Sequence, residues 1–251
     1  MSGHNKWSSI KHKKGAADAK RGKIFTKIIK EITIATRDGG PDPETNPTLR
    51  VAIKNAKGAN MPKDTMERAI KKGSGADAAS LQEMTFEGYA AHGIAVFVEC
   101  TTDNLNRTVS DVRAIFTKYN GALGTNGSLS FMFNRKGVFT LPKEAIGDMP
   151  LEELEMSLID GGLEELEAIE DEIIITCGFE DFGNMNSTLD SLNLEADSSE
   201  LQRLPTDTKV LSVDHAKSVL KMIDAFDEND DVNSVFHSME LTDDIITALE
   251  E

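Results

Sequence analysis

The chain has 251 residues, 39% of them hydrophobic and 28% charged, and its formal net charge is −16 at pH 7. This length exceeds the usual size of one domain, so we expect two or three domains with hydrophobic cores of their own. The sequence has no run of about 18 apolar residues, which argues against a membrane-spanning helix. Cys100 and Cys177 lie in apolar runs without the spacing of a metal site, so we expect buried thiols in a reducing cytoplasm.

The charges divide the chain into two unlike parts. Residues 1–75 contain 17 Lys and Arg against 7 Asp and Glu, a net charge of +10, whereas residues 76–251 contain 10 against 36, a net charge of −26. Such a split predicts that the basic part binds a polyanion, either nucleic acid or a membrane surface. The acidic part repels phosphate, which leaves the basic part as the binding surface.

Residues 1–15 are predicted to form a basic arm that contains the single tryptophan, Trp7. The arm lacks the apolar run of a secretory signal and the composition of a transit peptide, so we expect it to be the start of the mature protein. An amphipathic helix is predicted over residues 16–37, because Ile24, Ile28 and further apolar residues recur at helical spacing.

Two shorter helices are predicted to follow. Asn46-Pro47 begins the first, with Asn as the N-cap and Pro at the first helical position. Met61-Pro62 begins the second, which stops at Lys71-Lys72-Gly73. Three amphipathic helices with short connections predict a small helical bundle, and we assign residues 1–78 to a basic helical domain.

The hydrophobic period then changes to two, which is typical of strands. Strands are predicted over residues 86–89, 94–100 and 128–133, and a helix capped by Thr102-Asp103-Asn104 lies between the last two. This order is β–α–β, half of a split βαβ sandwich of the ferredoxin-like type.

A second, strongly acidic module is predicted from residue 138 onwards. The elements expected in it and after it are a strand over 138–141, a helix over 151–159, a strand over 173–177, a helix over 185–192, an extended stretch to 211, a helix over 214–227 and a strand over 232–237. The returning helix and strand complete the first sandwich. We therefore expect an α+β protein of three domains, with residues 138–205 inserted between residues 79–137 and 206–251.

The basic arm and the first helix supply the candidate nucleic-acid-binding residues. Lysines that neutralise phosphates release condensed counterions, and a tryptophan can stack on an unpaired base. The predicted binding residues are Lys6, Trp7, Lys11, His12, Lys13, Lys14, Lys20, Arg21, Lys23 and Lys27. Two alternatives stay open, in which Trp7 packs on the helical bundle and the lysines form only a solvated face. Abundant lysine with little Asn or Gln favours recognition of the nucleic-acid backbone or its shape over recognition of the base sequence.

No pattern in the chain predicts catalysis. His4 and His12 lack neighbouring carboxylates or thiols, so no metal site is predicted there. The glutamates of residues 152–155 and 164–167 are interpreted as solvated helix faces, with a divalent-ion site as the alternative. The sequence contains no pattern that groups a nucleophile with a general base and a residue that orients that base. We expect no catalytic residue, no cofactor and no enzyme, and a metal-dependent nuclease is the alternative.

Several blocks of the chain resemble the YebC/PmpR family. The resemblance covers the whole chain and is densest over residues 3–137. The matching blocks are GHNKWSSIKHKK at 3–14, DAKRGKIFTK at 18–27, NP at 46–47 with LR at 49–50, ANMPKD at 59–64, ERAIKKG at 67–73, EGY at 87–89, TDN at 102–104, NRT at 106–108 and GS at 127–128.

The resemblance implies a cytoplasmic, non-enzymatic protein with an N-terminal helical domain and two α/β domains, the third inserted into the second. Bacterial members are described as DNA-binding transcriptional regulators. Relatives are described as translation factors on ribosomes, including ribosomes stalled at proline runs, and a mitochondrial relative is a translational activator of cytochrome c oxidase. The implied partner is therefore DNA, or ribosomal or transfer RNA. The acidic domains are expected to contact the ribosome or other proteins.

Two positions depart from the family's pattern. The turn after the EGY block is usually rich in Gly and Pro, but here it reads AAHG at residues 90–93. Leu105 stands where the family usually has a basic residue after the TDN block. The loss of a charge beside Arg107 weakens the expectation that this second loop contacts nucleic acid.

Overall fold

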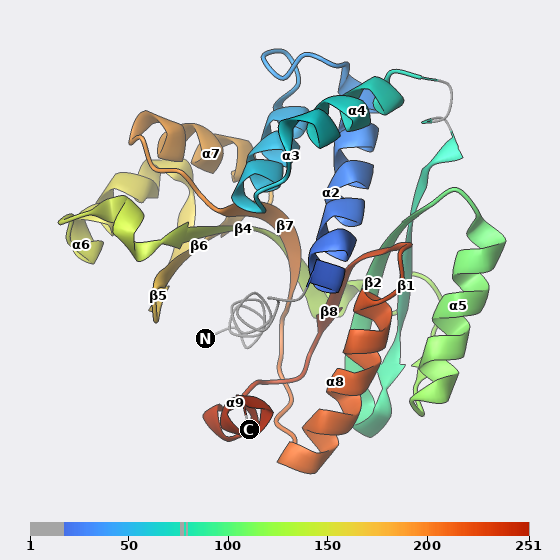
Figure 1. Cartoon of the computed structure of the whole chain (residues 1–251). Helices are drawn as coiled ribbons and strands as arrows, with labels where there is room; N and C mark the ends of the chain where they lie inside the picture. Colours follow the sequence, from blue (N-terminus) through green and yellow to red (C-terminus); the bar gives the residue numbers. More distant parts are fainter. Residues whose placement is uncertain (1–17, 76–77, 79, 251) are drawn as a thin grey trace. The chain divides into compact units, whose positions relative to one another are not determined.

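The computed structural model describes residues 18–75, 78 and 80–250. Three helices come first, and two four-stranded sheets with their own helices follow (Figure 1). This arrangement confirms the expected α+β fold class. By their contacts, the described residues form two compact units, one drawn from residues 18–27, 80–134 and 203–250 and the other from residues 28–75, 78 and 135–202. The division into three domains at residues 78, 137 and 205 stays a prediction.

The first three helices of the described chain match the predicted bounds to within about two residues. They are α2 (Asp18–Gly39), α3 (Pro47–Gly58) and α4 (Lys63–Gly73). The Asn46 side chain accepts a hydrogen bond from the Leu49 amide at 3.0 Å and donates to the Ala35 carbonyl at 2.7 Å. One buried side chain therefore caps α3 and ties it to α2, as the N-cap prediction requires. Within the described residues, none of the helices combines the length and hydrophobicity needed to cross a membrane.

The first sheet has the strand order β3-β1-β2-β8. Its strands are β1 (Gln82–Ala90), β2 (Ile94–Thr102), β3 (Ala122–Leu123) and β8 (Val232–His237). β1 pairs antiparallel with both β2 and β3, and β2 pairs antiparallel with β8. β2, helix α5 (Leu105–Lys118) and β3 thus form a split βαβ unit, with β1 lying between its two strands.

The strand expected over residues 128–133 is wrong. The chain forms a short 3-10 turn at Ser130–Met132, and the next strand, β4 (Phe133–Pro142), begins only at Phe133. The physical reason is a buried carboxylate. Glu87 on β1 accepts the amide of Gly127 at 2.8 Å and also that of Leu129, so these amides are not available to a strand partner.

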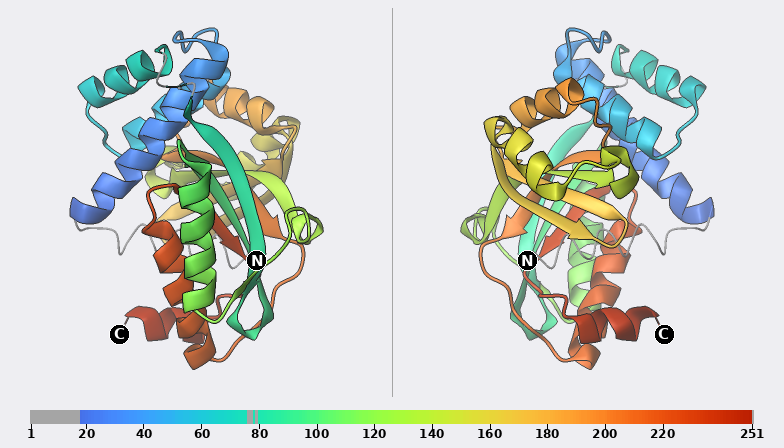
Figure 2. Two further views of the ribbon diagram at one scale, coloured as in Figure 1. Left: turned by 90° about the vertical axis from the view of Figure 1, so that its right-hand side faces the viewer. Right: turned by 90° about the vertical axis from the view of Figure 1, so that its left-hand side faces the viewer.

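Helices α5 and α8 (Val213–Asp227) cover one face of the first sheet (Figures 1 and 2). Phe116 of α5 and Phe226 of α8 meet edge to face with ring centroids 5.1 Å apart, in a core that includes Val96 and Val98 of β2. The opposite face carries a smaller cluster of Ala95, Phe97, Leu129, Phe133 and Phe236. Both faces are therefore packed, as the unbroken apolar run of β2 indicates.

The second sheet has the strand order β5-β6-β4-β7. Its further elements are α6 (Leu151–Leu158), β5 (Leu163–Ile169), β6 (Glu172–Gly178), α7 (Phe182–Ser191) and β7 (Ser198–Pro205). The chain order βαββαβ with this strand order is ferredoxin-like. Helices α6 and α7 pack together on one face (Figure 2), where Leu154, Leu158 and Met185 join Ile173 and Ile175 of β6 in one core.

One predicted assignment in this part of the chain needs correction, and two elements were missed. The glutamates of residues 164–167, interpreted as a solvated helix face, lie in strand β5. β5 is an edge strand, where charged side chains are common because one edge faces solvent. Strand β7 and the last helix, α9 (Asp243–Glu250), were not predicted. Short 3-10 turns complete the path at Ala91–Gly93, Lys143–Ile146 and Ile159–Gly161.

Candidate nucleic-acid interface

The structure describes the side chains of only two of the ten predicted binding residues. Six of the ten, Lys6, Trp7, Lys11, His12, Lys13 and Lys14, lie outside the described residues. Lys20 and Arg21 lie in the first turns of α2, and Lys23 and Lys27 lie one and two turns further along the same helix. The binding role of all ten residues stays a prediction.

Lys23 and Lys27 both contact the C-terminal end of α8. The Lys23 Nζ donates to the backbone carbonyl of Glu228, and the Lys27 Nζ lies 3.4 Å from the Asp227 carboxylate. The last carbonyls of a helix carry partial negative charge and lack helical partners, so they attract cations. The Lys27 and Asp227 side chains are only 18% and 14% exposed. A phosphate at Lys23 or Lys27 would therefore have to replace an intramolecular partner.

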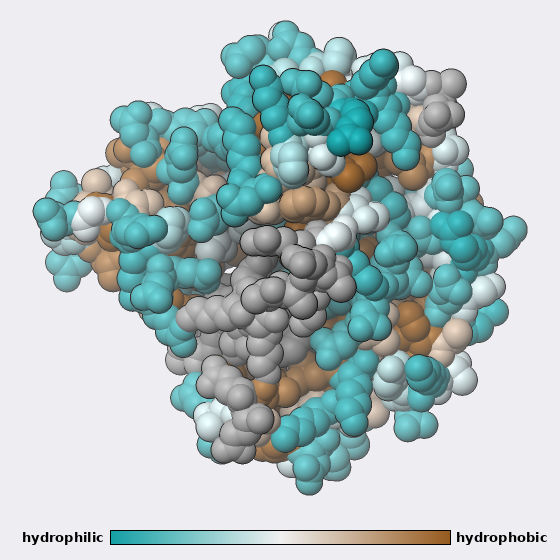
Figure 3. All heavy atoms as spheres, in the orientation of Figure 1, coloured by the Kyte–Doolittle hydropathy of each residue, from teal (hydrophilic) through white to brown (hydrophobic). Residues whose placement is uncertain are grey.

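Three other lysines of the helical segment are exposed. Lys57 lies in the last turn of α3, and Lys71 and Lys72 lie in the last turn of α4. None of the three forms an ion pair with another residue that the structure describes. Figure 3 shows a largely hydrophilic surface over the helices at the top of the picture. These lysines therefore present charge to solvent that no described carboxylate neutralises.

Most other cations of this segment serve local structure. Arg37 lies 2.6 Å from Asp38 and holds the pKa of that carboxyl below its usual value by hydrogen bonding. Arg50 donates to the carbonyls of Pro43 and Glu44 at 3.1 and 2.8 Å. Lys54 pairs with Asp190, and Lys63 lies 3.7 Å from Glu67. The tertiary structure thus separates the cations that have partners from those that face solvent.

The end of α4 that carries Lys71 and Lys72 is packed closely on α2. A Cβ atom placed on Gly73 would lie 2.5 Å from the Thr36 Cβ and 2.6 Å from the Thr33 carbonyl oxygen. Only glycine allows this approach, because such contacts are far inside van der Waals distance. The two lysines therefore project from a fixed helix end. In the sequence, they were interpreted only as a helix-stop signal, and their exposure at a fixed helix end was not predicted.

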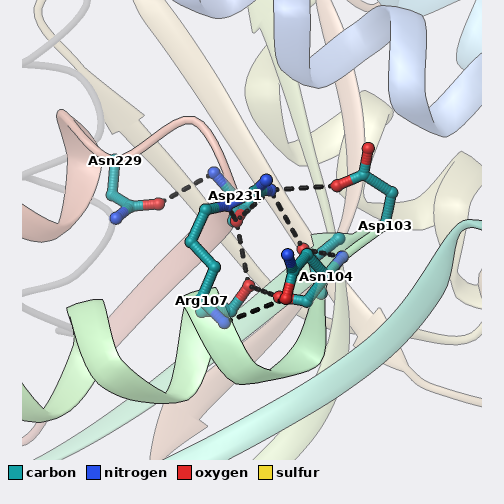
Figure 4. Close-up of polar contacts among 7 residues, drawn as sticks. Asp103, Asn104, Arg107, Asn229 and Asp231 are labelled. Carbon is teal, nitrogen blue, oxygen red and sulfur yellow. Dashed lines mark hydrogen bonds and ion pairs between the residues drawn. The ribbon is translucent and has the colours of Figure 1, made fainter.

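Arg107 lies between two carboxylates (Figure 4). Its guanidinium donates to Asp231 at 2.8 to 3.1 Å and to Asp103 at 3.0 Å. Thr108 also donates to Asp231 at 2.9 Å, and the Asp231 amide donates to the Asn229 side chain at 2.9 Å. These contacts join the start of α5 to the loop that precedes β8.

The Arg107 cluster is a structural connection between elements of one unit. Hydrogen bonds from Arg107 to Asp231 and then to Asp103 raise the pKa of the guanidinium. Asn104 accepts the Arg107 amide at 3.1 Å and caps α5, as the TDN block predicts. Two carboxylates already neutralise the Arg107 guanidinium, so it attracts a phosphate only weakly. This agrees with the weakened expectation that this loop contacts nucleic acid.

Within residues 18–75, 78 and 80–250, no group of three or more His, Cys, Asp and Glu side chains is arranged to hold a metal ion. The divalent-ion alternative for the acidic runs at residues 152–155 and 164–167 thus gains no support from the described structure. Neither cysteine forms a disulfide and both are buried, and burial raises the pKa of the Cys177 thiol to about 11. A buried thiol that holds its proton is a poor nucleophile.

Comparison with known proteins gives matches over the whole chain. Residues 5–76 match a sequence profile described as the TACO1/YebC protein N-terminal domain, and residues 81–239 match one described as the TACO1/YebC second and third domain. Two relatives named "Probable transcriptional regulatory protein" are 49% identical. The relative from Amoebophilus asiaticus aligns over 95% of this chain and 98% of its own, and the relative from Geotalea uraniireducens over 97% and 98%.

A solved structure has the same fold. The crystal structure of a conserved hypothetical protein from Aquifex aeolicus superposes with a TM-score of 0.80 at 40% sequence identity, covering 91% of this chain and 94% of that chain. A relative from Idiomarina loihiensis, also named a probable transcriptional regulatory protein, is 45% identical over the full length of both chains.

Proposed function

Because the chain belongs to the TACO1/YebC family, we propose that it is a regulator of gene expression that binds nucleic acid through its basic helical segment, residues 1–78. The observation that carries the proposal is the division of charge, +10 over residues 1–75 against −26 over the rest. The relatives' name, which is that of transcriptional regulators, supports the regulatory role.

Lys57, Lys71 and Lys72 extend the predicted binding surface beyond the basic arm. Their ammonium groups are exposed and have no described carboxylate partner. Each lysine that contacts a phosphate contributes about 0.9 to the salt slope of duplex DNA binding and about 0.7 for a single strand. Affinity that falls steeply with salt is therefore the expected property of this surface.

We further propose that the protein is cytoplasmic and has no catalytic activity, cofactor or metal of its own. The strongly acidic residues 138–205 then serve as a surface for basic proteins, which their charge complements. The proposed domain limits are residues 1–78, 79–137 with 206–251, and 138–205.

Replacing Lys71 and Lys72 by Gln tests the proposal. The double variant should bind a labelled 20-base-pair duplex more weakly, and its log–log salt slope should be smaller by up to about 2. The matched control replaces Lys217 and Lys221, two exposed lysines of α8, by Gln. An equal loss in the control would show a general charge effect and would refute a specific role for the helical segment.

A ribosome-associated translation factor that binds RNA through the same segment is the second candidate. One observation favours it over sequence-specific DNA binding. Asn55, an amide residue on α3 that could read a base edge, is bound to the backbone of Ser199 at 2.8 and 2.9 Å. The exposed cations are lysines, which contact phosphates more readily than they specify bases.

Crosslinking by ultraviolet light in cells distinguishes the two candidates. Sequencing of the bound DNA and RNA should show crosslinks that are lost when Lys13 and Lys14 are changed to Glu. Crosslinks at promoter DNA would establish transcriptional regulation, and crosslinks in ribosomal or transfer RNA would establish the translation factor. Crosslinks unaffected by the substitutions would contradict both.

A further inference from the structure

A long stretch of the acidic chain carries no charge. Residues 119–134, YNGALGTNGSLSFMFN, contain no Asp, Glu, Lys or Arg, although 28% of the whole chain is charged. Lys118 and Arg135 flank the stretch on its two sides. On a protein of net charge −16, a segment without carboxylates is one of the few places that a polyanion can approach without repulsion.

The middle of this stretch, residues 124–131, is held by the buried side chain and backbone of Glu87. Glu87 is 2% exposed. Its carboxylate accepts the amides of Gly127 and Leu129, and its backbone carbonyl accepts the amide of Gly124 at 2.7 Å. Gly127 has φ of +85° with open space around its Cβ position, so the backbone conformation itself calls for glycine. We call residues 124–131 the Glu87-anchored loop.

The loop exposes an aromatic ring at its end. Phe131 is 76% exposed, the largest fraction among the large hydrophobic residues of the described part of the chain. Leu129 and Phe133, two positions away on each side, are 2% and 4% exposed and lie in the core under the first sheet. The ring is thus presented outward by a backbone that is fixed on both sides.

The other exposed side chains of the loop are polar and neutral. Thr125, Asn126, Ser128 and Ser130 of the same loop are all exposed. Side chains of this kind offer hydrogen-bond donors and acceptors without charge, which suits the polar edges of an unpaired base whose flat face stacks on the ring. A protein partner that buries an aromatic anchor usually meets a surrounding apolar patch, whereas Leu129 and Phe133 on either side of this ring are buried and Met132 is half-buried.

We infer that the Glu87-anchored loop is a second nucleic-acid contact, in which Phe131 stacks on an unpaired base of a single strand. The inference rests on the proposed function and adds to it a preference for unpaired nucleotides. The lysines of residues 1–78 bind phosphates in any strand, whereas the Phe131 ring acts only where a base is free to stack.

Fluorescence anisotropy with two probes tests the inference in the full chain. The probes are a 5′-fluorescein-labelled oligouridine of 12 nucleotides and a labelled duplex of the same length. Phe131→Ala should weaken binding of the oligouridine by about 5- to 150-fold, the usual range for one stacked base, and leave duplex binding and the salt slope unchanged. Phe131→Trp should bind like the natural protein, and Phe131→Leu should bind like the alanine variant.

Phe179→Ala is the matched control, because Phe179 is another exposed aromatic residue, 45% exposed, beside Arg135. It should leave oligouridine binding unchanged. Equal affinity of Phe131→Ala and the natural protein for oligouridine would overturn the inference, as would an equal loss for oligouridine and duplex. Full binding by Phe131→Leu would indicate an apolar contact instead and would also overturn it. If the natural protein bound neither probe, the proposed function itself would fail.

Discussion

Asn55 joins the helical segment to the second sheet within one compact unit, so its replacement is expected to destabilise that unit. Its side-chain Nδ2 donates to the Ser199 carbonyl at 2.9 Å, and its Oδ1 accepts the Ser199 amide at 2.8 Å. The amide of one side chain therefore pairs with β7 in the way a neighbouring strand would. Lys54, the preceding residue, forms a more exposed ion pair with Asp190.

The magnitude follows from the groups that lose their partner. Ser199 is 3% exposed, so in Asn55→Ala its N–H and C=O both stay buried without this hydrogen bond. An unsatisfied buried polar group costs about 1–3 kcal/mol, and partial entry of water lowers the sum, so we expect a loss of about 2–4 kcal/mol in the free energy of unfolding. Lys54→Ala breaks a pair with side chains 34% and 48% exposed and should cost at most about 1 kcal/mol.

Urea denaturation followed by circular dichroism measures both variants under the same conditions. Asn55→Asp adds a further comparison, because its carboxylate still accepts the Ser199 amide but repels the Ser199 carbonyl. It should be at least as unstable as Asn55→Ala. If Asn55→Ala lost no more stability than Lys54→Ala, the paired hydrogen bonds would not hold the helical segment, and the reasoning would be refuted.

Three further results are expected. Gly58→Ala should destabilise the protein by about 1–3 kcal/mol in urea denaturation, because the added Cβ would lie 2.0 Å from the Asp197 carbonyl oxygen; a neutral result would mean that the backbone shifts freely. Glu87→Gln should release the loop at Leu129, because a Gln side chain has one acceptor oxygen for the amides of Gly127 and Leu129. Faster hydrogen exchange at residues 127–129 would show this release. Burial is the main reason why the pKa of the Cys177 thiol is raised to about 11. The contribution of this thiol to the free energy of unfolding is therefore complete below pH 9 and is lost as the pH rises from 9 to 11. Denaturation midpoints should therefore fall less steeply over that range in Cys177→Ala than in the natural protein.

Local signals predicted many of the elements correctly. Asn46 and Asn104 cap the helices that their positions indicated, and the strand expected over residues 232–237 has those bounds. These features depend on contacts within a few residues, which periodicity and capping rules describe. Strand β3 was missed, and residues 164–167 of the edge strand β5 were assigned to a helix face. Strand pairing joins distant residues, and β5 also carries glutamates on a solvent-facing edge.

The candidate site was only partly predictable. The division of charge placed it in the first 75 residues, but the sequence could not tell which cations have partners. Lys23 and Lys27, predicted to bind phosphate, contact the end of α8, whereas Lys57, Lys71 and Lys72 face solvent. The exposure of Phe131 was equally hidden, because it depends on the loop that the buried carboxylate of Glu87 in strand β1 holds.

The sequence by itself determined most of the helices, the apolar strands, the unequal distribution of charge and the family, since each depends on neighbouring residues or on composition. The tertiary structure decided the use of individual polar side chains. Asn55 pairs with a strand, Arg107 lies between Asp103 and Asp231, and Lys71 stays in solvent. A charged or amide group takes whichever partner the fold brings within about 3 Å, and that partner is usually far away in the chain.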